Sequence, residues 1–409
     1  MTDSVAETEH HAAVPFSPEA RPSAPLAERF IAAGETVAFT LLAIITALIV
    51  GGVVIVFTDP DTLSAWSDFF SDPLGALDAS WDIVYASYKA LFESSLGSTR
   101  ALSRTVLEAT PLIFAGLSVA LAFRAGLFNI GAAGQLMMGA AAAAYVGFNF
   151  DLPQVVHLPL TLAAGLAGGM LYGAIPGFLK AKTGAHEVIS TIMLNNIALF
   201  LLAYLLRLDT FQREGRNDPI SPPVLDSARF PDLPGPLDAD MAILLALATA
   251  GAVWWLLLRS TIGFRMRAVG ANPDASRAAG MGVGATYVLA MALAGGLAGM
   301  AGTVELVSRA SGSLTLGFFA QVGFDAIALA LVGRAKPGGV VAAAFLFGAL
   351  QAGSTGMQAA TETPVDIIIV IQALIIAFVA APAVVQAIWH VRAGRTEGAQ
   401  QFATGWGAA

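Results

Sequence analysis

Apolar stretches of about 20 residues recur along this chain, and they constrain its fold more than any other feature. The first, residues 36–57, reads TVAFTLLAIITALIVGGVVIVF and holds no charged residue. A helix of that length matches the roughly 30 Å hydrocarbon core of a bilayer. Only 12% of the 409 residues are charged, whereas soluble domains carry about 25%. The sequence therefore predicts an all-α, polytopic membrane protein.

The predicted transmembrane helices number about ten. They are residues 36–57, 105–124, 131–149, 158–179, 188–206, 241–258, 285–306, 319–333, 339–356 and 365–389. With a cytoplasmic N-terminus, most clusters of Lys and Arg fall on the cytoplasmic side, as the positive-inside rule requires. Both termini are therefore predicted to be cytoplasmic. Segments 131–149 and 319–333 are the weakest of these predictions, because each either crosses the membrane or enters and leaves it on the same side.

Composition divides the chain into a membrane domain and two tails. Residues 1–30 are polar, which predicts a disordered cytoplasmic tail, and 391–409 form a second cytoplasmic tail. Residues 31–390 form the transmembrane domain. Within it, segment 58–104 carries seven acidic and three basic residues among recurring aromatic side chains. This pattern predicts an amphipathic segment on the outer face.

Small residues recur at i+4 spacing in two of the predicted helices. Gly165, Gly169 and Gly173 form one such row, and Gly295 with Gly299 another, beside Ala298 and Gly302. Rows of this kind let helix backbones approach closely in lipid. They predict close helix packing rather than a ligand site.

Polar side chains interrupt three of the apolar segments. They are Asn129 and Gln135, then Thr191, Asn195 and Asn196, then Gln321 and Asp325. An uncompensated polar group in hydrocarbon costs on the order of a few kcal/mol, so these side chains must face protein or water. They line a solute path, or they hydrogen-bond between helices and hold the bundle together. For Asp325, the second alternative is an ion pair with an arginine such as Arg309. Glu187 is read as an interfacial group near Lys180 and Lys182.

The most basic inside loop, 259–285, has the features of a docking element. Its stretch NPDASRAAGM predicts a short helix with Asn272 as N-cap, Pro273 at the first position and Asp274 complementing the helix dipole. The predicted docking residues are Arg265, Arg267, Asn272, Pro273, Asp274 and Arg277. Composition alone favours a basic loop that only obeys the positive-inside rule.

Several stretches resemble one transporter family. RSTIGFRMRAVGANPDASRAAGM (259–281) is similar to the coupling loop of bacterial ABC importer permeases of the branched-chain amino acid, ribose and nucleoside group. Further similar stretches are PLIFAGLSVALAFRAGLFNIGAAGQLMMGA (111–140), HEVISTIMLNNIALFL (186–201), AGGLAGMAGTVEL (294–306) and GFDAIALALVGRAKPGGVVAAAFLFGAL (323–350). The resemblance covers roughly residues 100–390. It is strongest to the nucleoside subgroup that works with a basic-membrane-protein-type receptor.

This resemblance implies a permease subunit in a bacterial inner membrane that translocates a small neutral polar solute, a nucleoside or a related purine or sugar. The implied partners are a cytoplasmic ABC ATPase, an extracytoplasmic solute-binding receptor, membrane lipid and a second permease. A paralogue is favoured over a second copy, and no nucleic acid is expected. The permease itself is expected to hydrolyse nothing and to need no cofactor, metal or catalytic residue. The chain agrees in having neither a G-x-x-x-x-G-K-[ST] phosphate loop nor a cysteine.

Two further interpretations depend on Asp325 and its surroundings. An ion-coupled secondary transporter is the alternative function, and Asp325 would then be its first carboxylate to test. The stretches GLFNIGAAGQ (126–135) and LGFFAQVGFDAIA (316–328) follow the second and seventh predicted spans in opposite orientation. They suggest an inverted repeat.

Overall fold

The computed structural model describes residues 26–308, 311–319 and 322–390. Over these residues the chain is helical with irregular connections. The first helices are α1 (Leu26–Thr58), α2 (Pro60–Ser67), α3 (Pro73–Leu96), α4 (Thr99–Arg124), α5 (Ala132–Asn149), α6 (Gln154–Thr183) and α7 (Glu187–Leu205). They are followed by the 3₁₀ turn η1 (Asp226–Ala228), α8 (Ala242–Arg259), α9 (Thr261–Ala271), α10 (Pro273–Ala278) and α11 (Val283–Ser308). The last elements are η2 (Leu316–Phe319), α12 (Val322–Val332), α13 (Pro337–Thr361), α14 (Asp366–Ala380) and α15 (Pro382–Trp389).

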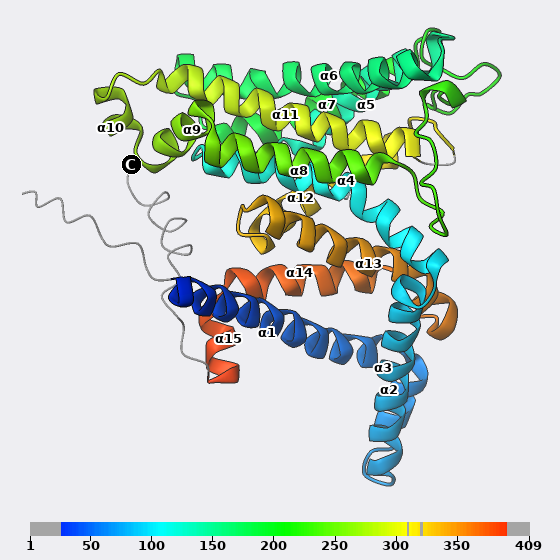
Figure 1. Cartoon of the computed structure of the whole chain (residues 1–409). Coiled ribbons are helices and arrows are strands. Elements are labelled where there is room, and N and C mark those ends of the chain that lie inside the picture. The colour runs from blue at the N-terminus through cyan, green and yellow to red at the C-terminus, as the bar shows by residue number, and fades with distance from the viewer. Residues whose placement is uncertain (1–25, 309–310, 320–321, 391–409) are drawn as a thin grey trace, which may run out of the picture.

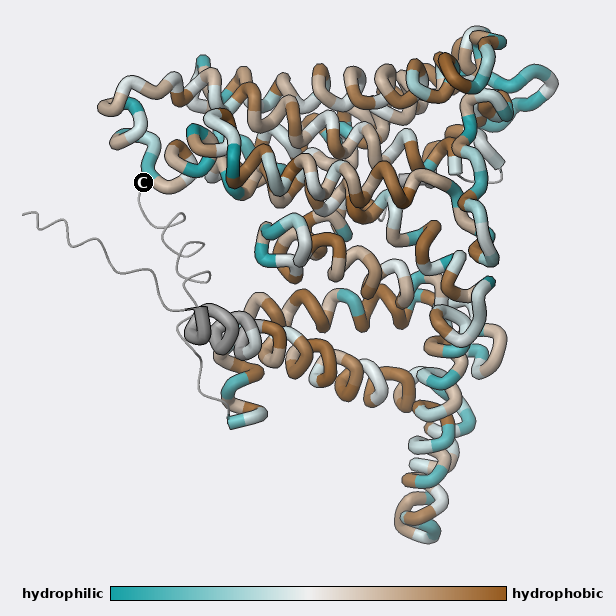
Figure 2. Tube along the Cα trace, viewed as in Figure 1, coloured by the Kyte–Doolittle hydropathy of each residue, from teal (hydrophilic) through white to brown (hydrophobic). Residues whose placement is uncertain are grey.

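The long helices run roughly along one direction, and their two ends differ (Figure 1). The short helices α9 and α10 lie at one end, here called the inner end. The helices α2 and α3 lie at the opposite end, here called the outer end. Figure 2 shows apolar residues along the long helices and more hydrophilic residues toward the ends. This is the distribution expected of a bundle that crosses a bilayer.

The predicted count of ten spans is not confirmed. Among the described residues, seven helices are long and apolar enough to cross a membrane, or eight if the bent pair α14 and α15 forms one span. The seven are α4, α6, α7, α8, α11, α13 and residues Val37–Thr58 of α1. α5, with 18 residues, is not among these helices. The polytopic, all-helical architecture itself is as predicted.

Two predicted spans differ from the helices that form. In place of 319–333, α12 has 11 residues and is only about 16 Å long, too short to cross a bilayer. In place of 365–389, α14 and α15 meet at a bend of 88°. Pro382 explains this bend, because its ring disfavours a helical conformation at Ala381, which has φ −112° and ψ 70°.

The predicted N-terminal tail and the predicted outer segment 58–104 both contain helices. α1 begins at Leu26, inside the range assigned to the N-terminal tail, and the rest of both tails lies outside the described residues. Segment 58–104 forms α2, α3 and the first turn of α4, at the outer end (Figure 1). Many of its apolar side chains are exposed, among them Phe70 at 98%, Leu74 at 71% and Trp81 at 69%.

The glycine rows form the closest helix contact in the bundle. A Cβ added at Gly169 of α6 would lie 2.2 Å from the carbonyl oxygen of Gly295 and 2.7 Å from Cα of Gly299, both in α11. Gly173 faces Gly295 in the same way, and Gly165 faces Thr303. Gly302, on another side of α11, meets the carbonyl of Leu136 in α5. The prediction that these rows allow close backbone approach is confirmed.

The two segments suggested as an inverted repeat meet inside the bundle. A Cβ added at Gly323, at the start of α12, would lie 2.4 Å from Cβ of Ala133, at the start of α5. The packing is reciprocal: α5 lies against α11, and α12 lies against α4. α4 therefore packs against α12, the short helix that follows α11, and α11 packs against α5, the helix that follows α4. This arrangement is consistent with the suggested repeat, which stays a prediction.

Candidate functional site

The predicted docking element is a short capped helix at the inner end. Asn272 precedes α10, and its Oδ1 accepts the backbone N–H groups of Asp274 and Ala275 at 3.0 and 2.9 Å. Pro273 occupies the first helical position. Gly280 adopts a left-handed conformation with φ +79° just beyond the helix. The prediction of a helix capped by Asn272 is confirmed, and its role in docking stays a prediction.

The charged groups of this element are open to solvent. Arg277 pairs with Asp274 through Nη1 and Oδ1 at 2.7 Å, and both side chains are exposed. Arg265 is exposed, and Arg267 is half-buried. An exposed intrahelical ion pair contributes little stability, since solvent screens it. These charged side chains are therefore accessible to a partner protein.

The helix before α10 is seated firmly on the bundle. Met266 and Val269 of α9 are fully buried. Next to them, Gly270 lies against Gly126, so that a Cβ added at Gly126 would be 2.9 Å from Cα of Gly270. Gly126 has φ +70° and belongs to the turn between α4 and α5, here called the α4–α5 turn (residues 125–131). α9 thus contacts this turn backbone to backbone.

The α4–α5 turn is held by two amides that bind each other. Nδ2 of Asn129 donates to Oε1 of Gln135 at 2.8 Å, and Nε2 of Gln135 donates to Oδ1 of Asn129 at 3.1 Å. The same Oδ1 also accepts the N–H of Gly131. Asn129 and Gln135 are 0% and 1% exposed. In this conformation their hydrogen bonds close the turn locally and do not join two helices, so both roles suggested for these residues stay predictions.

Asn195 of α7 caps the start of α5 from a neighbouring helix. Its Oδ1 accepts the N–H of Gly134 at 2.8 Å, and its Nδ2 donates to the carbonyl of Ile130 at 2.9 Å. The N-cap residue of α5, Gly131, has no side chain that could cap the helix. Thr191, one turn earlier, is fully buried and bonds within its own helix. Asn196 is exposed and donates to the carbonyl of Ile192 at 3.2 Å.

We expect Asn195→Leu to lower the melting temperature of the protein in detergent. The substitution leaves the N–H of Gly134 and the carbonyl of Ile130 without their side-chain partner, at a cost of about 1–3 kcal/mol for a buried group. Asn196→Leu is the matched control, because that side chain is exposed and bonds only to its own helix. Equal melting temperatures for the two variants would contradict the capping role.

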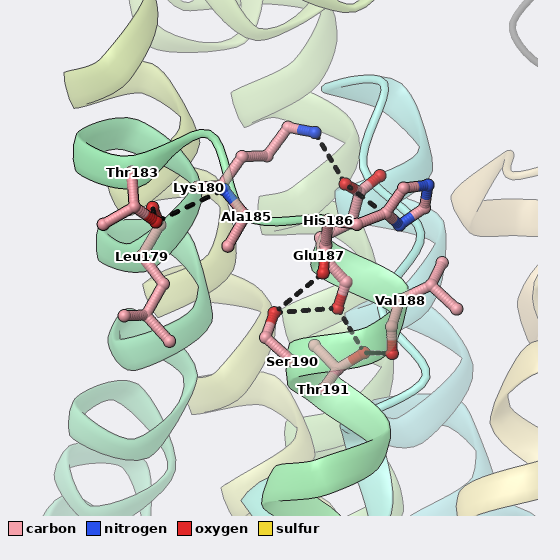
Figure 3. A network of polar contacts seen from close by, with 9 residues as sticks. All are labelled: Leu179, Lys180, Thr183, Ala185, His186, Glu187, Val188, Ser190 and Thr191. Atoms are coloured by element: carbon pink, nitrogen blue, oxygen red, sulfur yellow. Dashed lines mark hydrogen bonds and ion pairs between the residues drawn. The ribbon is translucent and has the colours of Figure 1, made fainter.

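A second polar network joins α6 to α7 (Figure 3). Nζ of Lys180 donates to Oε2 of Glu187 at 2.6 Å, and Nδ1 of His186 lies 4.0 Å from the same oxygen. Lys180 also lies 5.4 Å from the ring centroid of Tyr287 in α11. Glu187 therefore pairs with Lys180 at a helix end, as the sequence indicated, and its ion pair links three helices.

A cavity of about 400 Å³, lined by polar and apolar side chains, lies toward the outer end. Its lining includes the carboxylates Glu108 of α4, Glu305 near the end of α11 and Asp366 at the start of α14. It also includes the amides Gln351 of α13 and Gln372 of α14. This outer cavity is within the usual size range of small-molecule sites, roughly 300–1,000 Å³.

Asp325 lies beside the outer cavity and is connected to it by an amide. Nε2 of Gln351 donates to Oδ2 of Asp325 at 2.9 Å, and Asp325 is 5% exposed. Arg309, the ion-pair partner that the sequence suggested for Asp325, lies outside the described residues, as does Gln321, so that alternative stays a prediction.

The outer cavity was missed at the level of sequence. Glu108 and Asp366 lie near predicted span ends, where acidic residues are ordinary, and Glu305 stands alone in its segment. Glu305 is 6% exposed and lies in the last turn of α11. The cavity forms only when α4, α11 and α14 come together, and no spacing within one helix signals it.

Comparison with known proteins gives consistent matches. Residues 101–380 match the family model described as "Branched-chain amino acid transport system / permease component". The chain is 40% identical over 300 residues to the guanosine ABC transporter permease protein NupP of Bacillus subtilis, covering 73% of this chain and 86% of that protein. It is 34% identical to the glucose ABC transporter permease protein TsgB13 of Haloferax volcanii, covering 83% and 85%. It is also 34% identical to the nucleoside ABC transporter permease protein NupB of Lactococcus lactis, covering 73% and 84%. No solved structure matches the chain.

Proposed function

Because this chain belongs to the family of branched-chain amino acid transport system permease components, we propose that it carries a nucleoside or a related sugar into a bacterial cell. It is a membrane permease subunit of an ABC importer and not an enzyme, since ATP is hydrolysed in a separate subunit of such transporters. The family implies an ATPase and a substrate-binding protein as partners. The alternative of a secondary transporter receives no support from these relatives.

Two observations support the proposed solute: the names of the related permeases and the residues that line the outer cavity. Two of the relatives are named for guanosine or nucleosides and one for glucose, so sugar-containing solutes are common to them. Carboxylates and amides of the kind found at the outer cavity hydrogen-bond such solutes. The proposed path leads from this cavity past Asp325 toward the α4–α5 turn. In the described conformation the turn is closed by the Asn129–Gln135 pair.

The proposal includes a second permease subunit and a docking site for the ATPase. A second permease subunit, a paralogue or a second copy, completes the membrane unit. The ATPase docks on α9 and α10 through Arg265, Arg267, Arg277 and the capped turn of Asn272, Pro273 and Asp274. The most direct support is the exposed, Asn-capped helix α10 in a chain that matches the permease family over residues 101–380.

Uptake in vesicles tests this function. We expect purified permease, reconstituted with its ATPase and receptor, to import guanosine only when ATP is supplied on the ATPase side. An uncoupler should leave uptake unchanged, and Asp325→Asn should keep both properties. Uptake that stops on adding uncoupler to ATP-supplied vesicles, or that proceeds without the ATPase, would instead support a secondary transporter.

We further propose that the protein lies in the cytoplasmic membrane with both termini in the cytoplasm. Single cysteines can report this orientation, because the native chain has none. Asp226→Cys at the exposed η1 turn should react with an impermeant thiol reagent added outside intact cells. Ala279→Cys, exposed beside α10, should react only after the cells are opened. The reverse pattern would overturn the orientation.

A further inference from the structure

We propose that the outer cavity binds the sugar end of the solute, through hydroxyl groups that donate to its carboxylates. This inference rests on the proposed function, since it names the part of the transported molecule that the cavity recognises. It assigns Glu108, Asp366 and Gln372 as residues that determine specificity.

The first observation is the excess of hydrogen-bond acceptors. Glu108 of α4 and Asp366 of α14 line one cavity, beside Glu305 of α11, which already interacts with another group of the protein. An ionised carboxylate only accepts hydrogen bonds, and each of its two oxygens can accept two. A ligand that satisfies such a lining must supply donors. The vicinal hydroxyls of a ribose or a hexose supply several donors at close spacing.

The second observation is an amide donor without a partner. Gln372 lines the outer cavity and is 3% exposed, yet its Nε2 has no hydrogen-bond partner among the described residues. A buried donor left unsatisfied costs about 1–3 kcal/mol, so such groups are normally paired. A ring oxygen or hydroxyl oxygen of a sugar would accept from it. This donor also distinguishes a sugar from a simple cation, which has no acceptor to offer.

The remaining lining residues fit a compact, non-planar group. Besides the polar groups already named, they are mostly apolar and include Leu112, Val322 and Ile368. Among the described lining residues there is no aromatic ring on which a base could stack. Gln351 is fixed by its hydrogen bond to Asp325, which makes Asp325 a positioning residue for this wall.

The test compares two solutes that differ by one hydroxyl. Initial rates of ATP-dependent uptake are measured for guanosine and 2′-deoxyguanosine, with the same receptor in every vesicle preparation. Because the receptor does not change, any change in the ratio of the two rates between variants comes from the permease. Glu108 is half-buried and Asp366 exposed, so Glu108→Gln and Asp366→Asn are suited to leave the fold intact. Glu362→Gln, an exposed acidic residue that ends α13 outside the cavity, is the matched control.

We expect wild-type protein and Glu362→Gln to prefer guanosine, and the two cavity variants to lose that preference by about fivefold. A wild-type ratio near one, or an unchanged ratio in both cavity variants, would overturn the inference while leaving the importer function standing. Absence of ATP-dependent uptake of both solutes by wild-type protein would instead refute the proposed function. Gel filtration of each variant confirms that the protein is folded before its ratio is interpreted.

Discussion

Gly169→Leu is expected to abolish folding of the bundle. The new Cβ would lie 2.2 Å from the carbonyl oxygen of Gly295 and 2.7 Å from Cα of Gly299. Both are backbone atoms, so no side-chain rotation can relieve the contact, and α6 and α11 must separate. Overpacking by extra methylene groups in a side-chain core typically costs 1–3 kcal/mol, and a leucine against backbone adds to that. Because domains have only about 5–15 kcal/mol of net stability, loss of this interface exceeds what the fold can absorb.

The measurement is the yield of monodisperse protein from membranes, followed by gel filtration in detergent. Gly251→Leu is the matched control, since Gly251 also lies in a membrane helix, α8, but has no atom within 4 Å of its added Cβ. Gly169→Ala should give an intermediate yield. Wild-type yield and melting temperature for Gly169→Leu would show that α6 and α11 do not need this contact.

Asn272→Trp is expected to abolish transport while leaving insertion into the membrane intact. The substitution removes both hydrogen bonds that start α10, a loss of about 0.5–2 kcal/mol for an N-cap. A helix of six residues cannot persist without such support, because isolated short helices are unstable in water. The indole also occupies the exposed surface proposed to meet the ATPase. Arg277→Glu should have the same effect by reversing an exposed charge.

Two measurements separate docking from folding. Co-purification of the ATPase reports docking, and solute-stimulated ATP hydrolysis by the reconstituted complex reports coupling. Asn272→Ser is the matched control, because serine is also a preferred N-cap residue and adds no bulk. The coupling assignment fails if Asn272→Trp and Arg277→Glu both retain normal uptake and normal co-purification.

Local patterns were predictable from the sequence because their causes lie within a few residues. Asn272 caps groups two and three positions ahead, so the sequence NPDA specifies the start of α10. The glycine rows were recognisable because i+4 spacing places residues on one helix face. The bend at Ala381 also has a local cause, Pro382, but a hydropathy pattern that continues through residue 389 concealed it.

Features that depend on several helices were not predictable in this way. The partner of Asp325 is Gln351, 26 residues away in another helix, and nothing in either segment indicates the pair. Asn195 lies in α7 yet caps α5, 61 residues from the N–H that it accepts. The outer cavity combines Glu108 and Asp366, which are close only because α4 and α14 are brought together by α13 and α12. Such sites depend on tertiary packing and not on sequence spacing.

The contact between Gly126 and Gly270 has a consequence for how α9 and the α4–α5 turn move. Side chains between two elements add rotatable bonds, and these absorb small displacements as changes of rotamer. Here the backbone of α9 touches the backbone of the α4–α5 turn, with Cα of Gly270 only 2.9 Å from the Cβ position of Gly126. A sub-ångström shift of α9 therefore moves the turn at once, without waiting for side chains to rearrange. The junction is mechanically stiff, so α9 and the α4–α5 turn move together.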